Sequence, residues 1–170
     1  RACIAAEVLS HGVAFHGEWD RYHRNGTPGW QACRDGTVSG GEIISDILTG
    51  DQASVDEVGL VLAAARQARG VPGPEQGMHA HHDARDFTQA DKARLCHNLE
   101  VCQDLLLAYV GRRTRTSWCR PMSADEWARV HALVAQGTCH HDRYRAFNLN
   151  HLFSGNPRVE WRALGNTLNG

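Results

Sequence analysis

Long apolar runs are missing from this sequence of 170 residues. No stretch approaches the roughly 18 to 20 consecutive apolar residues that cross a bilayer. The N-terminal segment 1–15 carries Glu7 and His11 inside its apolar run. We therefore expect neither a signal peptide nor a membrane anchor, and no membrane partner.

Lysine is nearly absent, and the net charge is close to zero. Lys92 is the only lysine among 18 basic residues, which 19 acidic residues balance to a formal charge of −1. Such a balance excludes the broad positive field that draws proteins to nucleic acids or anionic lipids. Any site for a polyanion must therefore be local.

The cysteines include no CxxC pair, and six in a chain of this length are too few for a small disulfide scaffold. Their even number nevertheless permits complete pairing. They are Cys3, Cys33, Cys96, Cys102, Cys119 and Cys139. The localisation stays open, because full pairing would indicate a secreted protein and free thiols an intracellular one.

Ordinary globular composition is what remains. Apolar residues make up 42% of the chain and charged residues 22%, which is close to the average for folded domains. The length also suits one domain with a sizeable core. We expect a single helical domain over residues 1–170.

Helix signals dominate the local patterns. Three capping boxes, at 54–57, 88–91 and 123–126, each precede apolar residues at helical spacing. These three helices should end near Gly70, Gly111 and Gly137. Weaker patterns predict further helices in 2–15, in 41–48 and within 141–168. The expected fold class is all-α, an irregular bundle of about five to seven helices with long functional loops.

Two clusters of potential metal ligands lie in the expected loops. His79, His81 and Asp83 alternate along the first, so their side chains can point the same way, and Cys139 and His140 lie in the second. Imidazole, thiolate and carboxylate groups are the usual ligands of zinc. We expect the two loops to meet around one divalent metal ion, with zinc the foremost candidate.

Catalytic and substrate-binding roles follow from the neighbouring residues. His141 is the candidate general base, and Asp142 would orient it. Arg112, Arg113 and Arg115 form a local cluster that could bind phosphate. These residues predict a metal-assisted hydrolase of the nuclease type, which acts on a phosphodiester or nucleic acid. The alternative is a disulfide-stapled helical binding module, secreted or bound in an assembly, without catalysis.

Overall fold

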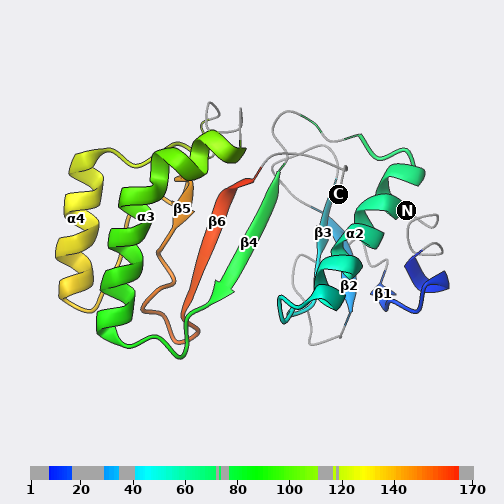
Figure 1. Ribbon diagram of the computed structural model, residues 1–170, viewed down its shortest axis with the longest axis horizontal. Coiled ribbons are helices and arrows are strands. Elements are labelled where there is room, and N and C mark those ends of the chain that lie inside the picture. The colour runs from blue at the N-terminus through cyan, green and yellow to red at the C-terminus, as the bar shows by residue number, and fades with distance from the viewer. Residues whose placement is uncertain are drawn as a thin grey trace. The chain divides into compact units, whose positions relative to one another are not determined.

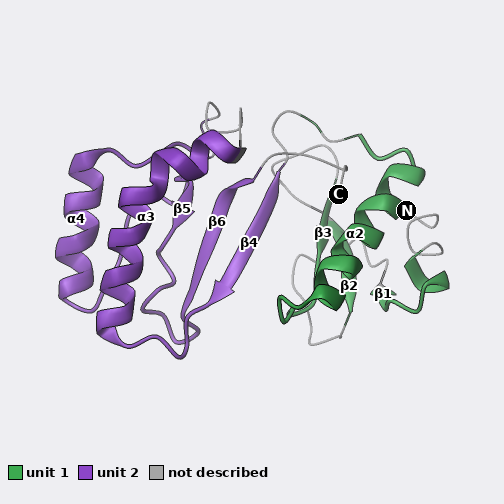
Figure 2. Ribbon diagram, viewed as in Figure 1, with its two compact units in different colours: residues 1–73, 167–170 green, residues 74–166 purple. Residues whose placement is uncertain are grey.

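The chain divides into two compact units, which are described one at a time (Figure 2). Unit 1 comprises residues 1–73 and 167–170, and unit 2 comprises residues 74–166. The computed structural model describes residues 8–16, 29–34, 41–71, 73, 77–110, 117 and 119–164.

Unit 1 combines a three-stranded sheet with one long helix (Figure 1). Its elements are β1 (Phe15–His16), β2 (Trp30–Arg34), β3 (Gly41–Ile44) and α2 (Gln52–Gln67). The sheet order is β1-β2-β3, with β1 parallel and β3 antiparallel to β2. Val61 and Ala64 of α2 belong to the same buried cluster as Phe15 and Trp30, so the helix supplies one side of the core.

Unit 2 has two helices and a second three-stranded sheet. Its elements are β4 (Met78–Asp83), α3 (Gln89–Val110), α4 (Ala124–Ala135), β5 (Phe147–Asn148) and β6 (Arg158–Leu164). The sheet is antiparallel in the order β4-β6-β5, so β6 is the central strand. Figure 1 shows α3 and α4 side by side on one side of this sheet.

The core of unit 2 lies between the helices and the sheet. Trp127, Val130 and Val134 recur along α4 at helical spacing and are buried. On β6, Val159 and Ala163 are buried in the same cluster, and Trp161 packs against it. Alternate residues of a strand point to opposite faces of the sheet, so Arg158, Glu160 and Arg162 lie on the other face.

The all-α prediction is wrong, because the described part of the chain contains six strands in two sheets. The weak helical patterns in 41–48 and 141–168 belong to segments that contain β3, β5 and β6. The histidine-rich stretch at 79–83, expected in a loop, lies in strand β4. Pairing with distant strands decided these conformations, whereas the helix prediction weighed only short local patterns.

The three strong helix predictions are confirmed by α2, α3 and α4. Ser123 and Glu126 form the expected capping box of α4, and Thr88 and Asp91 exchange the equivalent hydrogen bonds before α3. The first box is wrong in detail, because α2 begins at Gln52, earlier than predicted, and the Asp51 side chain accepts from the backbone N–H of Ser54. No helix in the described ranges is long and apolar enough to cross a membrane.

Replacing Ser123 with alanine is expected to destabilise the protein by about 1 kcal/mol. The substitution removes the side-chain oxygen that accepts from the backbone N–H of Glu126. Urea denaturation followed by circular dichroism measures the loss. Ser123→Asp keeps an acceptor at the cap and should lose much less, so equal losses in the two variants would contradict the capping role.

Candidate functional site

Polar side chains form a row across the sheet of unit 2, on the face that carries Glu160. In the strand register, Glu160 of β6 is paired with His81 of β4 on one side and with Asn148 of β5 on the other. Directly paired residues project from the same face of a sheet, so the three side chains are neighbours. Arg162 follows on the same face of β6. Together with His79 of β4, these residues form what we call the Glu160 site.

Glu160 is the centre of this site, and its carboxylate is held by three side chains. Its Oε1 accepts from Arg162 Nη1 at 2.5 Å and lies 3.3 Å from His79 Nδ1, while its Oε2 accepts from Asn148 Nδ2 at 2.7 Å. Only 6% of Glu160 and 7% of Arg162 are exposed. A buried carboxylate needs such partners, because burial without them costs several kcal/mol.

The protonation states at this site follow from its charges. Burial on its own raises the pKa of Glu160, but the Arg162 charge, the Asn148 hydrogen bond and the two histidines together hold this pKa below its ordinary value. Desolvation lowers the pKa of His81, against the opposing pull of the Glu160 carboxylate. Near pH 7 the site therefore presents an ionised carboxylate beside a neutral imidazole.

Positive charge surrounds the Glu160 site. Burial is the largest cause of the lowered pKa values of His81 and His151, and nearby positive charges lower them further. These charges come from Arg158 and Arg162 at His81, and from Arg158 and Arg143 at His151. Arg158 thus lies close enough to act on both histidines, and it adds positive charge beside the Glu160–Arg162 pair. Positive charge attracts anions, and guanidinium is the side-chain group best matched to phosphate.

The predicted ligands of the first cluster are only partly brought together. His79 and His81 both lie at Glu160. Asp83, at the end of β4, is exposed and forms an ion pair with Arg85, with 2.5 Å between Asp83 Oδ2 and Arg85 Nη2. The Arg85 hydrogen bonds hold the pKa of Asp83 below its ordinary value.

The ligands of the second cluster point to different surroundings. Cys139 is 2% exposed within the apolar core, and burial raises the pKa of its thiol to about 11. His140 is exposed. Within the described ranges, no group of three histidine, cysteine or acidic side chains could hold a metal ion. These side chains therefore give no support to the predicted zinc centre, which would need at least three protein ligands.

His141 has both ring nitrogens occupied by the backbone. Its Nε2 accepts from the N–H of Leu149 at 2.9 Å, and its Nδ1 lies 2.8 Å from the carbonyl oxygen of Asp142. The Asp142 carboxylate accepts from the N–H of Tyr144 and pairs with Arg120 rather than with the imidazole. In this arrangement His141 has no free lone pair with which to act as a general base.

The predicted phosphate-binding residues Arg112, Arg113 and Arg115 lie outside the described residues. The cysteines other than Cys3 are described, and all five carry free thiols: Cys33, Cys96, Cys102, Cys119 and Cys139. Burial raises the pKa of Cys96 to about 12, so its thiol is inert at neutral pH. This state gives no support to the disulfide-stapled alternative.

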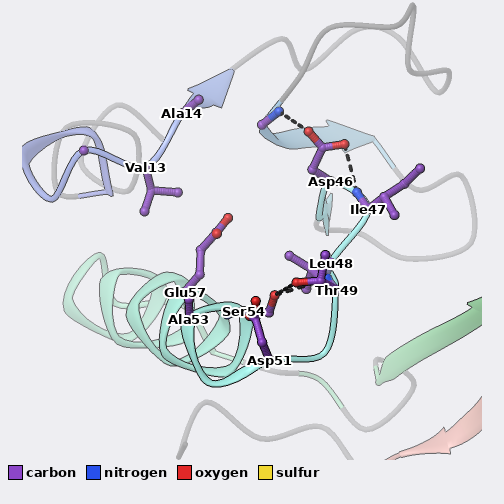
Figure 3. A pocket seen from close by; sticks show the side chains of 12 residues that line it. Val13, Ala14, Asp46, Ile47, Leu48, Thr49, Asp51, Ala53, Ser54 and Glu57 are labelled. Carbon is purple, nitrogen blue, oxygen red and sulfur yellow. Dashed lines mark hydrogen bonds between the residues drawn. The ribbon is translucent and has the colours of Figure 1, made fainter.

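Unit 1 contains a separate open cavity of about 490 Å³ (Figure 3). Asp46, Asp51 and Glu57 contribute carboxylates to its lining, which includes no basic residue. Figure 3 shows Glu57 extending from α2 on the side of Val13 and Ala14. Each carboxylate already accepts a hydrogen bond from the protein, with backbone N–H groups as donors to the two aspartates and the indole of Trp30 as donor to Glu57. These hydrogen bonds give each of the three carboxylates a role in holding the fold.

Sequence reasoning missed Glu160, Arg162 and Asn148. The signal that could have found the first two is the alternation of polar and apolar residues in Arg158-Val-Glu160-Trp-Arg162-Ala, which is typical of a half-buried strand. Asn148 has no comparable signal, because β5 has only two residues.

No protein-family model matches the chain, and neither does any curated protein or solved structure.

Proposed function

We propose that the chain is a metal-assisted enzyme that acts on a phosphate-bearing substrate, with the Glu160 site as its centre. The observation that carries this proposal is a buried, ionised carboxylate that shares one sheet face with two histidines and an arginine. A phosphodiester or nucleic acid is the substrate class that we expect, and hydrolysis is the reaction class.

The protonation states of the site support a divalent cation. Metal ligands must be deprotonated carboxylates or neutral imidazoles. The lowered pKa values of Glu160 and His81 favour those forms near pH 7. The ion would supply a polarised phosphoryl oxygen and an activated water molecule.

An imidazole beside a carboxylate favours a transition-metal ion such as manganese over magnesium, which prefers oxygen ligands alone. With few protein ligands, water and substrate phosphate would complete the coordination of the ion. Glu160 with one of the two histidines would provide the protein's share. Arg158 would then neutralise a phosphate oxygen that remains, while Arg162 stays paired with Glu160.

The test measures binding of Mn²⁺, a paramagnetic divalent cation, in the presence of inorganic pyrophosphate. Water proton relaxation reports the bound ion. His81→Ala is expected to weaken this binding by at least about tenfold, in line with the loss of one metal-site partner. His81 is exposed, so this variant should fold. Glu160→Gln should abolish binding.

Glu100→Gln is the matched control for the glutamate change. Glu100 lies on α3 and pairs with His131, with 2.7 Å between Glu100 Oε2 and His131 Nε2. This glutamate–histidine pair is not part of the Glu160 site. The Glu100 substitution should leave Mn²⁺ binding unchanged. Hydrolysis of bis(4-nitrophenyl) phosphate and of single-stranded nucleic acid by the natural protein and Glu160→Gln then tests the reaction. Absence of Mn²⁺ binding in the natural protein, or full binding in Glu160→Gln, would refute the proposal.

A further inference from the structure

One oxygen of the Glu160 carboxylate, Oε2, has a single side-chain partner, and that partner is neutral. Oε1 is shared between Arg162 and His79, whereas Oε2 receives the Asn148 amide at 2.7 Å. Asn148 is 4% exposed, so its amide has no access to bulk water. This contact fixes the rotation of the carboxylate about its last bond, and with it the direction in which the oxygen lone pairs point.

The orientation of the Asn148 amide is set by its neighbour. Its Oδ1 accepts from the backbone N–H of Asn150 at 3.2 Å, so Nδ2 is the atom left to face Glu160. An N–H group can only donate, and a carboxylate can only accept. The flipped amide would place its oxygen against the carboxylate and its NH₂ against the N–H, and both contacts would be lost.

A second layer of hydrogen bonds holds the backbone around Asn148. The Asn150 side chain and the His141 backbone bond each other twice, with 2.8 Å between His141 N and Asn150 Oδ1 and 3.0 Å between Asn150 Nδ2 and His141 O. The His141 ring adds the bond from Leu149 N to Nε2. These three bonds, which we call the His141 brace, tie residues 149–150 to the loop that precedes β5.

We propose that Asn148 is the positioning residue of the Glu160 site and that the His141 brace keeps it in place. This inference rests on the function proposed above for Glu160. It gives His141 a role through Asn150 and Asn148, in place of the catalytic role that its sequence context predicts. Metal and substrate would be bound by Glu160 only when Oε2 is held by the amide.

The decisive variant is Asn148→Asp, which has nearly the same shape but replaces the donor by a second carboxylate. Two buried carboxylates in contact cannot both stay ionised, so they should share a proton. In the ligand-free protein, ¹³C NMR of the glutamate carboxyl carbons should show Glu160 titrating in two coupled steps, one of them displaced upward. Asn98→Asp, on the exposed side of α3, makes the same change away from the site and should leave Glu160 unaffected.

Binding of Mn²⁺ with pyrophosphate gives the second readout. At about pH 7.5, Asn148→Ala, which removes the amide donor and adds no carboxylate that could itself bind the ion, should bind at least about tenfold more weakly than the natural protein. Asn98→Ala, the same change on the exposed side of α3, should leave the affinity unchanged.

A milder variant guards against loss of folding. Asn150→Ala removes two bonds of the brace but keeps the Asn148 amide. Glu160 should then titrate at higher pH than in the natural protein, because its hydrogen bond to Asn148 is weakened. If the Glu160 titration is unmoved in both Asn148→Asp and Asn150→Ala, the positioning role is refuted. If it moves while the natural protein binds no Mn²⁺, the positioning role stands and the proposed function fails.

Discussion

Methionine in place of Arg162 is expected to destabilise the protein by about 3 to 5 kcal/mol near pH 7. The side chains of Arg162 and Glu160 are 9% and 8% exposed and form an ion pair at 2.5 Å. Removing the guanidinium leaves a buried carboxylate without its principal opposing charge. The free energy of unfolding from urea titration measures the loss. Arg162→Lys keeps the positive charge, so this variant should lose less stability than Arg162→Met.

The size of this loss should depend on pH. In the natural protein the pKa of Glu160 is lowered, so its ionised form stabilises the fold above the unfolded-state pKa and this contribution disappears as the pH falls through the folded-state pKa. Without Arg162, burial should raise the folded-state pKa of Glu160 above the unfolded-state value. Stability is then present at low pH and is lost as the pH rises. The difference between the two proteins should therefore be largest near neutral pH and shrink in acid.

A double variant separates charge from packing. Replacing both members of a buried ion pair by apolar residues of similar size often costs little, because no unpaired charge remains. Arg162→Met combined with Glu160→Leu should thus recover a large part of the stability lost in Arg162→Met alone. If the double variant is as unstable as the single one at every pH, the loss comes from packing and the electrostatic explanation is wrong.

The helices of this protein could be predicted because their signals are local. Ser123 and Glu126 lie within one helical turn, and the buried residues of α4 repeat at helical spacing after them. The end of α2 shows the limit of such signals. Gly70 was the expected left-handed terminator, yet Arg69 takes the positive φ of 59° and Gly70 donates to the carbonyl of Ala65. Backbone hydrogen bonding placed the turn one residue earlier.

The strands could not be predicted with the same ease, because their partners are remote in the sequence. His81 of β4 pairs with Glu160 of β6, and two helices lie between them in the chain. Pairing of this kind depends on the whole unit rather than on neighbouring residues. The alternating pattern of 158–163 was available as a signal, but the short β5 gave none.

The candidate site was therefore predicted in part. The histidine-rich stretch that contains His79 and His81 lies on a strand of the candidate site, and both residues lie at Glu160. The second cluster is equally dense in potential ligands, but its side chains have different surroundings. Cys139 lies in the core, His140 is exposed, and His141 bonds the backbone. The residue type alone does not show whether a histidine will face a carboxylate, as His79 does, or bond the backbone, as His141 does. That depends on which backbone groups need a hydrogen-bond partner after folding.

The core of unit 2 depends most on Trp127, the largest of its fully buried side chains. It is 2% exposed, and its ring lies near those of Phe147 and His131, with centroids 6.4 Å and 6.2 Å away. Trp127→Ala is expected to cost about 3 to 5 kcal/mol, since the core can only partly close over the lost volume. Guanidinium denaturation should show this as a lower midpoint.

Trp127→Phe is the control that separates volume from polarity. The indole Nε1 of Trp127 is buried and has no hydrogen-bond partner among the described residues. Phenylalanine removes this unsatisfied donor, which offsets part of the cost of the smaller ring. The loss should therefore stay below about 1.5 kcal/mol, as for conservative changes in a core. A loss as large as that of Trp127→Ala would show that the indole N–H makes a stabilising contact in solution, and the account of this core as purely apolar would be wrong.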